Sequence, residues 1–309
     1  MIDFARLAAA NAPINAFLDF DRGAAFGDGP LSGVTVGVKA NIAVRGLPWT
    51  AGMRIFRDRI ATRDASCVAA LRAAGAAIVR TLNMEEAALG AKTDNPFFGR
   101  TDNPHRAGYT PGGSSGGSGA AVAAGLCDIA LGTDTMGSVR IPARYFGVYG
   151  FKPAQTSVSQ EGLEPAEASL DVIGPLARSL DLLERAARLT GIFGDDADAD
   201  PAPPVTLRAM GGVECSADVL RVFDHARDLC GCTGDFALED APSRIRYAGF
   251  IATARALHAA FGDADEGAMS PLLRKLIAYG PRRSDADRAE DERVIARTRA
   301  ALEAQVERH

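Results

Sequence analysis

Lysine is scarce in this chain of 309 residues. Of its 34 basic residues only four are lysines, and the others are arginines. An arginine does not lose its proton inside a protein, whereas a buried lysine can. The candidates for a side chain that takes up a proton are therefore few: Lys39, Lys92, Lys152 and Lys275.

Histidine, the usual base of serine hydrolases, is equally rare. The chain has only four histidines, and none lies in a sequence context that suggests a Ser-His-Asp triad. Surface or packing roles are favoured for all four: His105, His225, His258 and His309. A catalytic role stays open for His105, because it lies in a long polar loop.

The chain also lacks an excess of positive charge and any long apolar run. Its net charge of -5 and the absence of a Lys/Arg cluster argue against a nucleic-acid partner. The apolar stretches are far shorter than the roughly 20 residues that cross a membrane. Residues 1–6 lack the basic-then-apolar pattern of a secretory signal. We therefore expect no membrane association and a cytoplasmic location.

The five cysteines are an odd number and are dispersed along the chain. Cys230 and Cys232 form a C-x-C pair, but no second pair or histidine follows at the spacing of a zinc site. Cytoplasmic cysteines usually stay reduced, so we interpret them as ordinary thiols. The sequence predicts neither a metal site nor a cofactor.

Strand and helix patterns alternate along the first half of the chain. Patterns typical of apolar strands cover 34–39, 77–81 and 129–134. Patterns typical of helices cover 3–9, 64–74, 84–91, 120–124 and 285–307. Asp64 and Asn83 are the expected N-caps of two of these helices. The alternation indicates an α/β layered fold, and the acidic, proline-rich residues 195–204 are predicted as a linker or surface loop.

Glycine and serine are concentrated in residues 112–119, just before a predicted helix. A flexible loop would explain this composition but not the sharp change into a helix. A phosphate-binding loop is an alternative, because glycine loops that precede helices bind anions. However, neither the Gly-Lys-Ser/Thr ending nor the G-x-G-x-x-G spacing of nucleotide sites is present.

A second glycine-containing loop, residues 132–143, follows the predicted strand 129–134 and carries Ser138. A serine after a tight turn at a strand end exposes its hydroxyl while neighbouring N–H groups point toward one spot. Acyl transfer needs this combination of a nucleophile and an oxyanion hole. Lys39, at the end of an apolar strand, is the candidate base, because burial disfavours its charged form and a neutral amine can accept a serine proton.

These three segments together resemble the amidase signature family, the Ser-cisSer-Lys hydrolases. The matching stretches are 37–42, with the lysine; 112–118, with the serine pair; and 132–143, continuing into 147–153. The resemblance covers about residues 15–189. It implies one domain over 1–309, with the core motifs in 30–190 and a mixed, twisted β-sheet flanked by α-helices on both faces.

The resemblance also assigns roles to individual residues. It implies that Ser138 is the nucleophile, Ser114 the bridging serine after a cis Gly113–Ser114 peptide bond, and Lys39 the base. Asp134 and Arg140 are expected to support the loop. The remaining implied site residues are the oxyanion-hole amides of Thr135, Met136, Gly137 and Ser138, and the substrate contacts Gly113, Ser115 and Met136.

Three departures from the family pattern stand out. Met136 occupies a position that is usually glycine, which suggests that its side chain shapes the pocket. Ala40 replaces the acidic residue that commonly follows the lysine, with little catalytic loss expected. Residues 205–309 correspond to a shortened C-terminal part, and an apolar sheet edge left uncovered there is an aggregation hazard unless a partner chain covers it.

The sequence therefore predicts an amidohydrolase that cleaves the C–N bond of a small carboxamide, acylamide or urea-like substrate through a serine acyl-enzyme. One alternative within the family is the glutamine-hydrolysing subunit of an amidotransferase, which works with partner subunits. The other alternative, from a different class, is a catalytically impaired homologue that acts as a binding protein. Homodimerisation through the N- or C-terminal helices is a further hypothesis.

Overall fold

The computed structural model describes residues 2–21, 23–192, 204–207 and 214–306. These residues form two compact units. Unit 1 comprises Met1–Gly194 and Ala260–Leu276, and unit 2 comprises Asp195–Ala259 and Ile277–His309. The predicted loop 195–204 lies outside the described residues except for Pro204. The interpretation of the chain as one domain stays a prediction.

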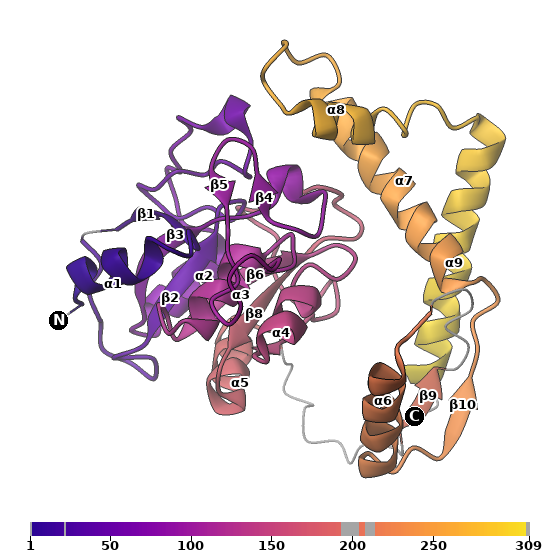
Figure 1. Ribbon diagram of the computed structural model, residues 1–309, viewed down its shortest axis with the longest axis horizontal. Coiled ribbons are helices and arrows are strands. Elements are labelled where there is room, and N and C mark those ends of the chain that lie inside the picture. Colours follow the sequence, from indigo (N-terminus) through magenta and orange to yellow (C-terminus); the bar gives the residue numbers. More distant parts are fainter. Residues whose placement is uncertain (1, 22, 193–203, 208–213, 307–309) are drawn as a thin grey trace. The chain divides into compact units, whose positions relative to one another are not determined.

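A mixed six-stranded sheet forms the centre of unit 1 (Figure 1). Its strands in spatial order are β1 (Phe17–Phe20), β3 (Ala77–Leu82), β2 (Thr35–Lys39), β6 (Ile129–Asp134), β8 (Val172–Ala177) and β7 (Tyr149–Gly150). Strands β3, β2 and β6 are parallel, whereas β1, β8 and β7 pair antiparallel to their neighbours. The short strands β4 (Asp94–Asn95) and β5 (Gly99–Arg100) pair separately. The α/β fold with a mixed sheet, as predicted, is confirmed.

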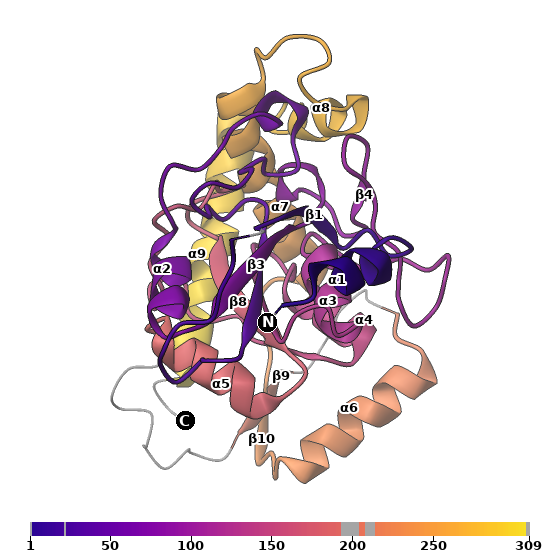
Figure 2. The same ribbon diagram turned by 90° about the vertical axis from the view of Figure 1, so that its left-hand side faces the viewer.

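Helices cover both faces of this sheet, and Figure 2 shows the two layers on either side of the strands. The helices of unit 1 are α1 (Phe4–Asn11), α2 (Ser66–Ala73), α3 (Gly116–Ala123), α4 (Arg140–Phe146), α5 (Leu180–Leu189) and most of α8 (Pro271–Ile277). Side chains of α2 and α5 pack into one core cluster, and those of α3 and α4 pack into another. Ala77, Ile78 and Val79 of β3 enter the two clusters alternately, as the period of a strand requires.

The small residues of α3 allow it to pack closely against the sheet and against α4. A Cβ atom on Gly117 would lie 2.3 Å from the carbonyl oxygen of Asn83, and one on Gly119 would lie 2.6 Å from the ring of Phe146. Ser118 is buried and donates a hydrogen bond to the carbonyl oxygen of Leu131 in β6 at 3.1 Å. The glycine-serine segment is therefore partly a packed helix rather than a flexible loop.

The predicted helix over 84–91 is wrong. Only a 3₁₀ turn, η2 (Glu86–Ala88), forms there, and Ala87 and Ala88 have φ angles of 49° and 55°. Tertiary contacts outweigh the local propensity, because the Glu85 amide donates to the carbonyl oxygen of Ser114 at 3.1 Å. The Glu85 carboxylate accepts the amide of Lys92 at 2.8 Å.

The expected cap at Asp64 is also wrong, because helix α2 begins after Ala65 and has no side-chain cap. Asp64 instead accepts the amide of Arg45 at 2.8 Å and pairs with Arg72 of α2 at 2.9 Å. The other predicted strands and helices form close to the expected positions, and 3₁₀ turn η1 (Arg54–Phe56) is an additional element.

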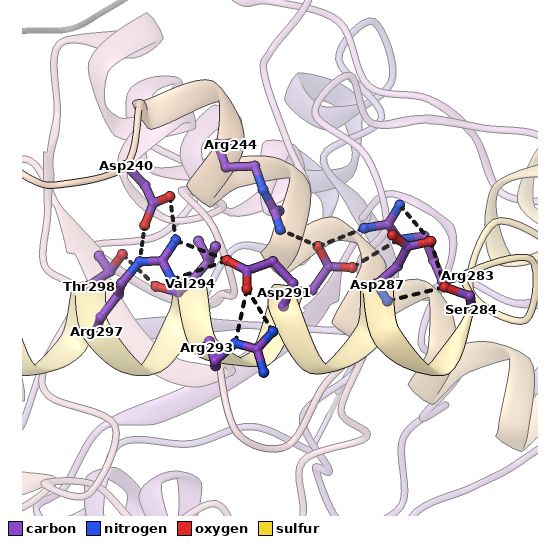
Figure 3. Close-up of polar contacts among 11 residues, drawn as sticks. Asp240, Arg244, Arg283, Ser284, Asp287, Asp291, Arg293, Val294, Arg297 and Thr298 are labelled. Carbon is purple, nitrogen blue, oxygen red and sulfur yellow. Dashed lines mark hydrogen bonds and ion pairs between the residues drawn. The ribbon is translucent and has the colours of Figure 1, made fainter.

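Unit 2 contains two short parallel strands and long, charged helices. Its elements are β9 (Val205–Leu207), β10 (Gly234–Phe236), α6 (Ala217–Leu229), most of α7 (Pro242–Phe261) and α9 (Asp285–Val306). Asp291 of α9 is buried between Arg244 of α7, at 2.7 Å, and Arg283, at 3.0 Å (Figure 3). Six residues further along α9, Arg297 forms two hydrogen bonds to Asp240, of 2.5 and 2.7 Å. Ion pairs therefore hold much of α9 in place.

A membrane-crossing helix would need a longer and more apolar stretch than any helix in the described part of the chain provides.

Candidate active site

The structure places Lys39 at the carboxyl end of β2, fully buried beneath two hydroxyl groups. Its Nζ lies 2.7 Å from Oγ of Ser114 and 2.7 Å from Oγ1 of Thr133. Burial lowers the pKa of Lys39 from 10.5 to about 7, against the opposing charges of Asp171, Asp134 and Glu85. A large fraction of Lys39 is therefore a neutral amine near pH 7.

Ser114 lies directly after a cis peptide bond to Gly113, as the family resemblance implies. Gly113 has no room for a side chain, because an added Cβ would lie 2.8 Å from the amide nitrogen of Lys92. The next residue, Ser115, donates its amide to the carbonyl oxygen of Ser138 at 3.2 Å. This backbone bond joins the loop of Ser114 to the loop of Ser138.

The Ser115 hydroxyl is hydrogen-bonded to the backbone of β6. It is completely buried, donates to the carbonyl oxygen of Thr133 at 3.1 Å and accepts the amide of Thr133 at 3.2 Å. The structure therefore places this side chain against β6, and the predicted contact of Ser115 with substrate stays a prediction.

The loop that carries Ser138 is held by the buried carboxylate of Asp134. Its oxygens accept the amides of Gly137 at 2.6 Å and Val139 at 3.1 Å, and both accept from the Arg140 guanidinium at 2.9 Å. Burial raises the pKa of Asp134, but the Arg140 hydrogen bond and charge outweigh it and keep the pKa below its ordinary value. The predicted supporting role of Asp134 and Arg140 agrees with this geometry.

The four predicted oxyanion-hole amides differ in their surroundings. The amide of Gly137 already donates to Asp134, which competes with a bond to substrate. Within the described residues, the amides of Thr135, Met136 and Ser138 have no hydrogen-bond acceptor. Met136 is 39% exposed, whereas Ser138, the nucleophile candidate, is only 8% exposed.

A sequence model of the amidase family, described as "Amidase", matches residues 6–212. The chain belongs to the amidase family. The match includes Lys39, Ser114 and Ser138, and it ends at residue 212, inside the range Asp195–Ala259 of unit 2.

Relatives with 42% and 48% identity belong to this family as well. They are a glutamyl-tRNA(Gln) amidotransferase subunit from Salinibacter ruber, matched over 65% of this chain, and one from Methanospirillum hungatei, matched over 86%. The matched regions span 41% and 71% of those proteins. The amidase chain thus covers only part of the length of these relatives.

Solved structures agree with the family and the fold. A crystal structure described as an amidase superimposes with a TM-score of 0.80 at 29% identity, over 98% of this chain and 74% of that one. The corresponding glutamyl-tRNA(Gln) amidotransferase subunit from Thermotoga maritima gives a TM-score of 0.72 at 27% identity, over 93% and 68%. Both share the mixed sheet on which the Lys39 cluster is built.

The local sequence pattern does not predict that Thr133 lies in this amidase site. Its hydroxyl lies next to Lys39 Nζ and also accepts the side-chain amide of Asn41 at 3.2 Å. Thr133 lies within the recognised motif 132–143, but a threonine inside a buried strand gives no signal by itself that its hydroxyl faces a lysine 94 residues away.

The alternative base, His105, lies elsewhere. Its ring Nε2 is 3.2 Å from the carbonyl oxygen of Phe146, and the ring packs edge-on against the Phe146 ring. This is a packing role, as the sequence favoured. Among the described residues, moreover, no three His, Cys, Asp or Glu side chains gather where they could hold a metal ion.

Proposed function

We propose that this amidase cleaves the C–N bond of a small amide through a serine acyl-enzyme, with Lys39 as base, Ser114 as proton relay and Ser138 as nucleophile. The observation that carries the proposal is the fully buried Lys39 amine, 2.7 Å from the Ser114 hydroxyl and with a pKa lowered to about 7. A buried lysine without a carboxylate bonded to it is costly unless its neutral form is used.

The reaction proceeds by two acyl transfers. Neutral Lys39 takes the proton of Ser114, Ser114 takes that of Ser138, and the Ser138 oxygen bonds to the carbonyl carbon. The C–N bond then breaks, and the departing nitrogen receives the proton returned from Lys39 through Ser114. Water attacks the acyl ester by the same proton path, which releases the carboxylic acid and restores the Ser138 hydroxyl.

Thr133 contributes to this step by fixing the direction of the amine. When Lys39 is neutral, one N–H donates to Oγ1 of Thr133 and the nitrogen lone pair points toward the Ser114 hydroxyl. The amides of Thr135, Met136 and Ser138 are the available donors for the oxyanion, and loss of one such donor slows acyl transfer by about 100- to 1000-fold. Met136 is exposed, and we expect its side chain to contact the acyl group of the substrate.

The test is mass spectrometry of the purified chain after treatment with a fluorophosphonate. We expect one adduct on Ser138, no adduct in Ser138→Ala, and labelling slowed by at least about 100-fold in Lys39→Ala, since loss of the general base removes a contribution of that order. A folded wild-type chain that forms no adduct would refute the proposal and favour the binding-protein alternative.

A second candidate is the release of ammonia from glutamine, because relatives with up to 48% identity are subunits of glutamyl-tRNA(Gln) amidotransferases. Glutaminase activity of this chain, measured by itself and with the other subunits of such a complex, separates the two functions. Ammonia release that appears only with the partners would favour the second candidate over a free-standing amidohydrolase.

A further inference from the structure

Two buried carboxylates hold the loop between β6 and α4, and only one of them belongs to that loop. Asp134 binds the loop from within. Asp171 lies just before β8, 36 residues after Thr135 in the chain, and is 1% exposed. The hydroxyl of Thr135 donates a hydrogen bond to Oδ1 of Asp171.

The orientation of the Asp171 carboxylate is itself fixed. Its second oxygen, Oδ2, accepts the amide of Ala166 at 2.6 Å and that of Glu167 at 3.3 Å. Both oxygens are therefore occupied, and the carboxylate cannot turn away from Thr135 without losing charge-assisted hydrogen bonds. Strand β8, which follows Asp171, pairs with β6 along its whole length, so the anchor and the loop share one rigid sheet.

We propose that Asp171 is a positioning residue, which acts through the Thr135 hydroxyl to hold the Thr135 amide where the oxyanion forms. This inference rests on the proposed function of Ser138. The amide of Thr135 is one of the three loop amides without an acceptor among the described residues. The side chain of the same residue is hydrogen-bonded to Asp171. Displacement of a catalytic donor by about 1 Å is enough to cost about 100-fold in rate.

The same carboxylate also acts on Lys39 by its charge. Three carboxylates oppose the effect of burial on Lys39, and Asp171 contributes most, ahead of Asp134 and Glu85. Loss of the Asp171 charge therefore lowers the pKa of Lys39 further. The acid limb of the pH–rate profile then moves to lower pH, an effect that a purely structural residue would not produce.

The first test compares fluorophosphonate labelling of Ser138 in Thr135→Val, Thr135→Ser and Thr35→Val. Thr35 is a matched control, because its hydroxyl donates to Asp128 at 2.6 Å at the opposite end of the sheet. We expect the labelling rate constant to fall by about 10- to 100-fold in Thr135→Val, somewhat less than for loss of a donor. It should fall less in Thr135→Ser, which keeps the hydroxyl, than in Thr135→Val, and should stay within about threefold of wild type in the control Thr35→Val. Equal rates for Thr135→Val and Thr35→Val would overturn the proposal.

The second test measures the pH dependence of labelling in Asp171→Asn, which removes the charge with little change in shape. We expect its acid limb to lie at lower pH than that of wild type, and an unmoved limb would refute the electrostatic part. If Asp171→Asn does not fold, the Thr135 variants still decide the positioning part.

Deuterium uptake by the peptide containing residues 134–139 separates failure of this inference from failure of the proposed function. Uptake should be faster in Thr135→Val than in Thr35→Val, because the loop loses its anchor. If wild type forms no adduct but the difference in deuterium uptake is present, the proposed chemistry is wrong, while the stabilisation of the loop by the contact between Asp171 and Thr135 stands. If wild type is labelled on Ser138, but Thr135→Val and Thr35→Val have the same labelling rate and the same deuterium uptake, the positioning role of Asp171 is wrong and the proposed chemistry stands.

Discussion

The Nζ of Lys39 and the Oγ1 of Thr133 lie 2.7 Å apart on two adjacent parallel strands, 94 residues apart in the chain. Val38 pairs with Leu131 in the ladder between these strands, which brings the two following strand ends together. The lysine thus ends among hydroxyl groups rather than beside a carboxylate. This environment explains why burial dominates its pKa, and it yields the first two predictions.

Activity should depend on the protonation of Lys39. With a pKa of about 7, the fraction of neutral amine falls about tenfold for each pH unit below that value, and the acylation rate should fall with it. Labelling rates of Ser138 by a fluorophosphonate from pH 5 to 9 give the measurement, corrected for probe hydrolysis. A flat profile over this range would exclude Lys39 as the base.

The free energy of unfolding should depend on pH in a way that reflects the lowered pKa of Lys39. The folded-state pKa of Lys39 is depressed to about 7 from 10.5, so between these values the unfolded chain binds more protons than the folded chain. The contribution of Lys39 to the free energy of unfolding therefore rises from pH 7 to pH 10.5. Below pH 7 Lys39 is protonated in both the folded and the unfolded chain, so its contribution is constant there and has its least favourable value.

Urea unfolding of wild type and Lys39→Met at pH 6, 7, 8.5 and 10 tests this sign. Lys39→Met should be the more stable protein at pH 6 and 7, and its advantage should shrink as the pH rises. The difference between the two proteins cancels the titration of all other groups. An advantage that grows with pH would contradict the depressed pKa.

Gly117 should not tolerate a side chain. An added Cβ would lie 2.3 Å from the carbonyl oxygen of Asn83 and 2.7 Å from that of Ala16, both backbone atoms that cannot move aside alone. We expect Gly117→Ala to destabilise the chain by about 3 kcal/mol, measured by urea unfolding.

The control for this change is Gly27→Ala in the same unit. Gly27 is exposed, and the nearest atom to its added Cβ is at 3.4 Å, an ordinary contact. We expect an effect within about 0.5 kcal/mol, as for other surface substitutions. Similar losses for both variants would mean that close packing of α3 is not what excludes a side chain at Gly117.

Asp291 should be the most sensitive ionic residue of unit 2. Asp291→Asn leaves Arg244 and Arg283 without the carboxylate between them. Breaking a buried pair costs about 3–5 kcal/mol, and partial exposure of both arginines reduces this to about 2 kcal/mol. Calorimetric unfolding gives the measurement. Asp287→Asn, at an exposed carboxylate paired with the same Arg283, serves as the control and should change stability much less than Asp291→Asn does.

Local pattern alone determined much of this protein. The strands around Lys39, at 77–81 and at 129–134 formed as predicted, because their apolar runs are buried on both faces of the sheet. The motifs with Lys39, Ser114 and Ser138 also identified the family from the sequence. Motifs of this kind are short, and their residues carry the same chemistry wherever the fold brings them together.

Only the tertiary structure decided which groups meet. The turn at Glu86–Ala88 replaced a predicted helix because long-range contacts to Ser114 determine the backbone there. Asp171 became an anchor for Thr135 because β8 pairs with β6, a relation that neither residue reveals locally. Hydrogen bonds between distant residues depend on strand order and register, so their partners follow from the assembled sheet and not from sequence spacing.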